Sequence, residues 1–155
     1  MSEKTQHTLR PLSKDDLDRV VAIDHALSGQ SRRGFYERRL AAALKEPKGF
    51  IYVAACLDDR LVGFVFARIL GGEFGAQKSV AVLDALGTDP EDRRKGAGQA
   101  MLEHLEQVMR DKGIAELQTQ ADWSNRSLLT FLDAAGFERA PRVVLERDVS
   151  APMPS

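Results

Sequence analysis

The chain has 155 residues, of which 43% are hydrophobic and 29% are charged, and its formal net charge is −1. This is the length and composition of one ordinary globular domain, and the near-neutral charge argues against a general nucleic-acid-binding protein. No apolar run approaches the ~20 residues of a membrane span, and the N-terminal MSEKTQHT lacks a signal-peptide core. We therefore expect one cytoplasmic domain over residues 1–155 with a loose tail from about residue 150, no membrane or nucleic-acid partner, and no metal site.

The first half of the chain predicts a strand, two helices and a β-hairpin. Ser13 and Asp16 resemble a capping box at the start of the first helix, and Ser28–Ser31 breaks that helix from the next. Two segments rich in β-branched and aromatic residues, joined at Asp58–Arg60, form the hairpin. The predicted elements are a strand at Thr8–Leu12, a helix from about Leu17, a helix at about Arg33–Lys45, and strands at Phe50–Leu57 and Leu61–Leu70.

The second half alternates strands with helices, after a loop that contains Gly71, Gly72 and Gly75. A strand–helix–strand unit favours parallel pairing, whereas a hairpin is antiparallel, so the sheet is expected to be mixed and flanked by helices. The fold class is therefore α/β, in the α+β sense. The predicted elements are a strand at Lys78–Thr88, a helix from Ala97 to about Lys112, a strand at Ala115–Ala121, a helix at Ser124–Ala135, and a strand pair over Phe137–Val149 interrupted near Pro141.

The stretch RRKGAG, Arg93–Gly98, lies between the predicted strand ending at Thr88 and the helix opening at Ala97. Two glycines at a strand-to-helix junction allow a tight turn that points several backbone N–H groups outward at the positive end of the helix dipole. That arrangement suits a phosphate or pyrophosphate, and Arg93, Arg94 and Lys95 add positive charge. We call Arg93–Gly98 the phosphate loop; the alternative is a basic turn with a glycine-rich cap. A Walker loop is excluded because no Gly-Lys-Ser/Thr ending is present, and a dinucleotide fingerprint is excluded because Met101 stands where a third glycine is needed.

Arg93-x-x-Gly96-x-Gly98 resembles the Q/R-x-x-G-x-G/A signature of the GNAT superfamily of acyl-CoA-dependent N-acetyltransferases. The preceding Thr88–Glu91 stands where that family has a strand end reading V-x-P. A second block agrees downstream, with Asn125, then Phe131, then Ala135-Gly136-Phe137. The resemblance implies a mixed, mostly antiparallel sheet of six to seven strands, flanked by four helices and splayed apart at the cofactor site.

The same resemblance implies how acetyl-CoA (coenzyme A) would be held. It assigns pantetheine contacts to the end of the central strand, and pyrophosphate contacts to backbone N–H groups of the phosphate loop. It assigns Asn125 to the pantetheine arm, with the alternative that Asn125 only caps the following helix, and it packs Phe131 along the cofactor, with the alternative of a core residue. The strand-end residues are Leu86, Gly87 and Thr88, and the loop residues are Arg93, Arg94, Lys95, Gly96, Ala97, Gly98 and Gln99.

Asp84 is the candidate catalytic base. It lies within an otherwise apolar strand, where a carboxylate needs a partner or a purpose, and four residues before Thr88, where many family members carry a Glu base. An amine acceptor with a pKa near ~10.4 must lose a proton before it attacks the thioester. The alternative is a structural carboxylate paired with a neighbouring Arg. Glu73 and Glu37 are weaker candidates for binding the amine.

One departure from the family pattern concerns the general acid. The family often places a Tyr seven residues beyond the asparagine, and that position is Leu132 here. Tyr36 could substitute from another helix, although its place in an apolar stripe favours a core role. Two functions therefore stay open at this point: an N-acetyltransferase that acts on a small-molecule or protein amine by direct attack in a ternary complex, or a catalytically weak CoA-binding sensor. The resemblance also allows a homodimer.

Overall fold

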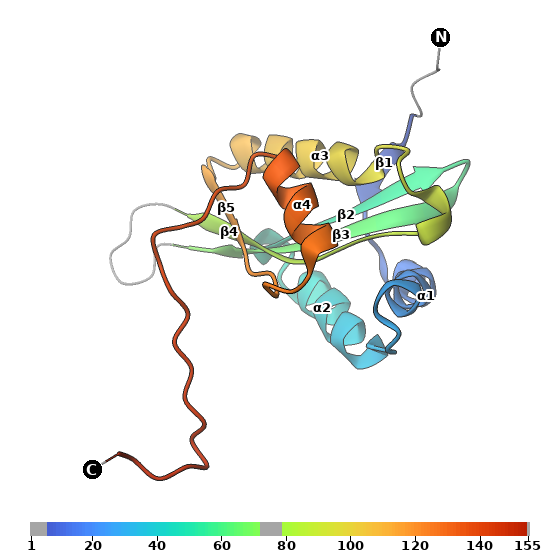
Figure 1. Cartoon of the computed structure of the whole chain (residues 1–155). Coiled ribbons are helices and arrows are strands. Elements are labelled where there is room, and N and C mark those ends of the chain that lie inside the picture. The colour runs from blue at the N-terminus through green and yellow to red at the C-terminus, as the bar shows by residue number, and fades with distance from the viewer. Residues whose placement is uncertain (1–5, 72–78, 155) are drawn as a thin grey trace. The chain divides into compact units, whose positions relative to one another are not determined.

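The computed structural model describes residues 6–71 and 79–154 (Figure 1). The chain divides into two compact units, Met1–Gln120 and Ala121–Ser155. Each unit is described by itself. Residues 72–78, which carry the predicted glycine-loop positions Gly72 and Gly75, the candidate Glu73 and the predicted strand start at Lys78, lie outside the described residues.

The first unit is built on a mixed sheet of five strands in the order β1-β2-β3-β4-β5. The pairs β1–β2, β2–β3 and β3–β4 are antiparallel, and β5 pairs parallel with β4. The described residues form five strands rather than the six to seven expected, because the strand pair expected in the second unit does not form. The strands are β1 (Thr8–Pro11), β2 (Phe50–Leu57), β3 (Arg60–Leu70), β4 (Val80–Thr88) and β5 (Glu116–Thr119).

Helices cover both faces of this sheet. The helices α1 (Leu17–Ser28) and α2 (Arg33–Lys45) lie on one face, and α3 (Ala97–Asp111) lies on the other (Figure 1). Short 3-10 helices stand before α1 (Lys14–Asp16), before β2 (Pro47–Gly49) and after β4 (Pro90–Asp92). The capping box is confirmed: the Ser13 N–H donates to Asp16 Oδ2 at 2.8 Å. The predicted bounds of α2 match the structure at both ends.

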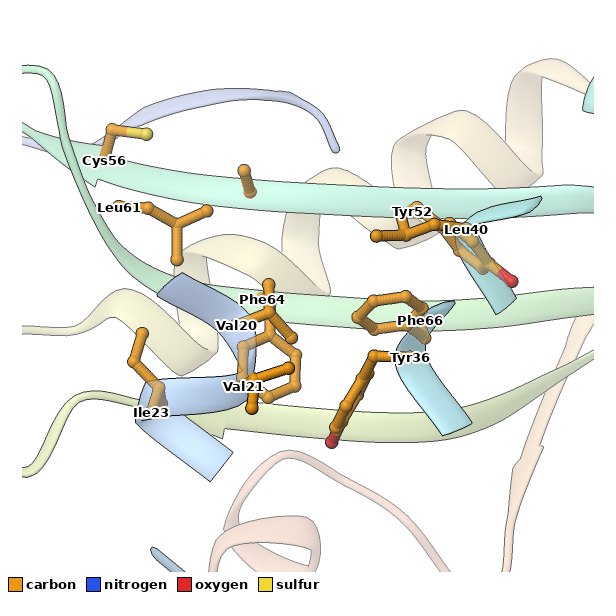
Figure 2. Close-up of a cluster of buried hydrophobic side chains, with 11 residues drawn as sticks. Val20, Val21, Ile23, Tyr36, Leu40, Tyr52, Cys56, Leu61, Phe64 and Phe66 are labelled. Atoms are coloured by element: carbon orange, nitrogen blue, oxygen red, sulfur yellow. The ribbon is translucent and has the colours of Figure 1, made fainter. Parts of the chain in front are cut away.

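The core between the sheet and α1 and α2 is aromatic, and Figure 2 shows its side chains converging from four elements. Side chains alternate along a strand, so β3 sends Phe64 and Phe66 to this face together with Tyr52 of β2. Tyr36 of α2 lies edge-on to Phe64, with ring centroids 5.6 Å apart. The opposite face of the sheet packs on α3, whose Met101 is fully buried and fills the space beside Gly63.

The second unit contains one helix, α4 (Arg126–Ala134). Gly136 follows it with φ +92°, the left-handed conformation that ends helices and favours glycine. No strand forms among residues 137–154, so the predicted strand pair over Phe137–Val149 is wrong. A strand is stabilised by a ladder partner, and this stretch pairs with no described strand while its Val143 and Leu145 are more than four-fifths exposed.

Candidate functional site

The end of β4 separates from β5. The two strands pair from Val80 with Glu116 to Leu83 with Thr119, and the pairing stops there. Beyond it, β4 stays bonded to β3 as far as Gly63 with Thr88. Within the described part of the first unit, the edge of β4 that faces away from β3 therefore has no strand partner over its last five residues, Asp84–Thr88. Backbone N–H and C=O groups on such an edge can bind an extended ligand in the manner of an added strand.

A β-bulge marks the point of separation. Phe66 of β3 pairs with Ala85, but the next residue, Ala67, pairs with Leu83, so Asp84 is the extra residue of β4. A bulge bends its strand, increases the local twist and redirects a side chain, and bulges are common beside functional sites. Here the bulge presents Asp84 to the face of the sheet that carries α2, because Asp84 contacts Arg39 of that helix.

The phosphate loop turns tightly through two residues with positive φ. Arg94 has φ +64° and Gly96 has φ +86°, both in the left-handed region. Gly96 is the N-cap of α3, and a Cβ built on it would meet no atom within 4 Å. Its conformation, and not crowding, is therefore what favours glycine.

The N-terminus of α3 offers uncapped donors. The first intrahelical hydrogen bond runs from the Ala100 N–H to the Gly96 carbonyl at 3.0 Å. The earlier amides of Ala97, Gly98 and Gln99 precede that bond, and Gly96 has no side chain to accept from them. With the dipole of a 15-residue helix behind them, these donors suit an anion.

Ion pairs fix the turn that leads into the phosphate loop. Asp92 is 1% exposed, and its Oδ1 accepts from Arg60 at 3.1 Å and from Lys95 at 3.3 Å. Burial alone would raise the pKa of Asp92, but the hydrogen bonds from Arg60 and Lys95 outweigh it and hold the pKa below its ordinary value. Asp89 pairs with Arg19 of α1 and accepts the Glu91 N–H at 3.0 Å. The Lys95 ammonium group is thus paired with Asp92 and stabilises this turn.

The two remaining cations of the loop are free to meet a ligand. Arg93 and Arg94 are exposed, and neither forms an ion pair with a described residue. The two arginines precede Ala97, the first of the uncapped amides, by four and three residues, so positive charge and backbone donors gather at one corner of the first unit. The alternative interpretation, a basic turn with a glycine-rich cap, describes the same backbone without giving these donors a partner.

Asp84 lies among arginines. Its Oδ1 accepts from Arg68 Nε at 3.1 Å, and its Oδ2 lies 3.6 Å from Arg39 Nη1, too far for a hydrogen bond. Oδ2 is buried and has no hydrogen-bond partner among the described residues. The ion pairing expected of a structural carboxylate is thus present, but one oxygen is left unsatisfied in a place where the chain also forms a cavity.

This cavity, of about 420 Å³, lies where β4 and β5 separate. Polar side chains make up much of its wall, and sequence reasoning missed all of them except Asp84. A signal was available: Arg68 interrupts an apolar strand, and Gln118 and Gln120 alternate along β5 and just beyond it. The lining residues are Arg68, Leu70, Val82, Leu83, Asp84, Gln118, Thr119 and Gln120.

Three residues that the family resemblance singled out, two for the cofactor and one for the position of the general acid, belong to the second unit. Asn125 caps α4, since its Oδ1 accepts the Leu128 N–H at 3.2 Å, as the capping alternative expects. Phe131 and Leu132 lie in α4, and their carbonyls accept N–H groups that close its C-terminus. The roles of Asn125 and Phe131 toward a cofactor stay predictions of the sequence.

Tyr36 and Glu37 differ in accessibility. Tyr36 is 1% exposed and donates to Asp24 Oδ1 at 3.0 Å, and burial, reinforced by that carboxylate, raises its pKa. Tyr36 is therefore a core residue, as its place in an apolar stripe favoured. Glu37 is exposed and lies 3.9 Å from Arg33.

In the described ranges, no cluster of three or more His, Cys, Asp or Glu residues could hold a metal ion. None of the described helices is long and apolar enough to cross a membrane.

Comparisons with known proteins identify the family and the fold of this chain. The model of the acetyltransferase (GNAT) family matches residues 16–137. A mycothiol acetyltransferase of Kocuria rhizophila is 28% identical over 120 residues, which are 74% of this chain and 38% of that protein, so the chain spans well under half of this relative. A [ribosomal protein bS18]-alanine N-acetyltransferase of Escherichia coli is 33% identical over 134 residues, 86% of this chain and 82% of that protein. An aminoglycoside N-acetyltransferase solved in complex with CoA superposes with a TM-score of 0.74 at 18% identity, covering 96% of this chain and 98% of the other, and shares the fold.

Proposed function

This chain belongs to the acetyltransferase (GNAT) family, and from that premise we propose that it is an acetyl-CoA-dependent N-acetyltransferase. The acetyl group passes to a primary amine by direct attack in a ternary complex. One observation carries the proposal: the end of β4, whose outer edge has no described strand partner, leads through the short 3-10 helix Pro90–Asp92 and the phosphate loop into the uncapped N-terminus of α3. An extended arm and a pyrophosphate are the two parts of CoA that need those two surfaces.

The residues present fit the cofactor. Amides of Ala97, Gly98 and Gln99, with those of Arg94, Lys95 and Gly96 before them, would hold the pyrophosphate, and the Arg93 and Arg94 side chains would balance its charge. Leu86, Gly87 and Thr88 would hydrogen-bond the pantetheine arm through the free edge of β4. Acetyl-CoA held by these residues would supply an activated acetyl thioester.

Asp84 would help to deprotonate or to position the acceptor amine. It lines that cavity and keeps one carboxylate oxygen without a hydrogen bond among the described residues. An ammonium group could donate to that oxygen and then lose its proton to it or to water. Arg68 and Arg39 share the carboxylate, so positioning the amine is the part of this role that the contacts support best.

Departure of the thiolate would proceed without a dedicated acid. Leu132 has no proton to give, and the Tyr36 hydroxyl is buried and committed to Asp24. A thiol with a pKa near ~8.5 is a good leaving group, so water or the proton shed by the amine completes the step.

The second candidate function is a CoA-binding sensor with little turnover, and the same lack of an acid favours it. Measuring CoA release from acetyl-CoA across a panel of amines separates the two. The transferase releases CoA only when a suitable amine is present, whereas a sensor binds acetyl-CoA and releases none above hydrolysis. A single domain over residues 1–155, a cytoplasmic location and a homodimer stay predictions.

A further inference from the structure

Among the described residues, two positive side chains contact the one negative side chain in the wall of this cavity, that of Asp84. Arg68 lines the cavity with Asp84, and Arg39 lies 3.6 Å from the second oxygen of the same carboxylate. The two arginine side chains are about one-third exposed, at 37% and 32%, while Asp84 is 10% exposed. Two guanidinium groups therefore share one carboxylate at a partly desolvated position.

Most of the donors on these guanidinium groups have no acceptor among the described residues. Each group carries five N–H donors. The only hydrogen bond from either group to a described residue is that from Arg68 Nε to Asp84 Oδ1. Arg39 has no hydrogen-bonded acceptor in the described part of the chain, and its guanidinium rests 5.1 Å from the Phe35 ring centroid.

The backbone of Arg39 and the side chain of Arg68 are also held in place. The Tyr52 hydroxyl donates to the Arg39 carbonyl at 2.9 Å, which ties α2 to β2 at this residue. Burial raises the pKa of Tyr52 to about 12, against the opposing charge of Arg39, so the phenol stays a donor at neutral pH. Arg68 is fixed through Asp84 and lies on β3, inside the sheet. Positioned forks with free donors are what bidentate recognition of an oxyanion requires.

We propose that the amine acceptor carries an oxyanion, a carboxylate or a phosphate, that is bound by Arg68 with Arg39 beside it. This inference rests on the proposed function and names the chemical class of its acceptor. Asp84 binds the ammonium group of the acceptor and the guanidinium groups bind its anionic group, so the site recognises a zwitterion. A polycationic amine would instead bring positive charge to two arginines, which disfavours it.

The test uses two matched pairs of amines with the full chain and acetyl-CoA: O-phosphoethanolamine against ethanolamine, and β-alanine against β-alaninamide. We expect kcat/KM to be higher for the anionic member of at least one pair by about tenfold or more, the size of one charge-assisted hydrogen bond. Which pair shows the preference distinguishes phosphate from carboxylate.

Variants then locate the preference. Arg68→Gln should lower the anionic-to-neutral ratio by about tenfold, through a higher KM for the anionic amine, with acetyl-CoA affinity unchanged. Arg68→Lys, which keeps the charge and loses the fork, should keep part of the preference and serves if the glutamine variant does not fold. Arg38→Gln, an exposed neighbour of Arg39 on the same helix, should leave the ratio unchanged.

An equal or inverted preference in the wild type, or a preference that survives in Arg68→Gln, overturns the inference while turnover still upholds the proposed function. If no amine is acetylated, the proposed function fails, and binding decides the inference instead. Calorimetry with CoA present should then detect O-phosphoethanolamine or β-alanine binding more tightly than its neutral partner, and equal or absent binding of both pairs refutes it.

Discussion

Replacing Gly96 with valine tests the phosphate loop against a control that the same helix provides. Gly96 precedes α3 with φ +86°, and Gly113 follows it with φ +74°. A Cβ at either position would meet no atom within 4 Å, so neither substitution creates a clash within the described residues. Each should lower the free energy of unfolding by on the order of 2 kcal/mol, the cost of a side chain in the left-handed region. A domain of ordinary stability stays folded after such a loss.

The two variants should differ in cofactor binding alone. Valine at position 96 would bring a branched side chain to the space in front of the uncapped amides of α3, and would shift the backbone that aims them. We expect Gly96→Val to weaken acetyl-CoA binding at least tenfold, about 1.4 kcal/mol. Gly113→Val lies at the far end of the helix and should bind acetyl-CoA as the wild type does. Calorimetry on both, with melting curves to match their stabilities, makes the comparison. Equal affinities in the two variants would show that the cofactor does not use this loop.

Three further substitutions test the roles assigned to single side chains. Asp84→Asn should keep the affinity for acetyl-CoA and lower turnover by on the order of 10²; wild-type turnover across the pH range would leave Asp84 a structural role only. Leu132→Tyr and Tyr36→Phe should each change turnover little. A gain in turnover of about a hundredfold in Leu132→Tyr, or a loss of turnover in Tyr36→Phe with acetyl-CoA binding intact, would contradict transfer without a dedicated acid. The pKa of Asp92 is lower in the folded chain, so its contribution to stability is complete above its unfolded pKa near ~3.9 and is lost as the pH falls through the folded value. Asp92→Asn should therefore be less stable than the wild type at pH 7, by roughly 1–2 kcal/mol after screening by solvent. Chemical unfolding should find that this difference in the free energy of unfolding shrinks below about pH 4. A difference that stays constant with pH would rule out the charged pair as its cause.

Local patterns in the sequence predicted much of the fold. The spacing of apolar residues predicted α2 at its observed bounds, and the paired glycines predicted a tight turn where Gly96 has a left-handed conformation. These features depend on residues near one another in the chain. The strand pair over Phe137–Val149 was wrong because β-propensity alone does not supply a ladder partner.

The cavity was harder to predict because it depends on register. Asp84 stands out in the sequence, but its place in a bulge follows from how β3 aligns with β4, which no local pattern reports. Arg39 and Arg68 come from an exposed helix face and an apolar strand, and only the tertiary structure brings them to one carboxylate. The oxyanion specificity that we infer was therefore out of reach of the sequence.

The most direct test of the central claim follows the acetyl group itself. The protein is mixed with acetyl-CoA labelled in its acetyl group and with the amine panel, and mass spectrometry then measures both CoA and N-acetylated amine. We predict that labelled N-acetyl product forms in equal amount to the CoA released, and that both form on the order of 10² more slowly when Asp84 is replaced by Asn. Tight binding of acetyl-CoA with no labelled product from any amine would contradict the transferase and leave a CoA-binding sensor.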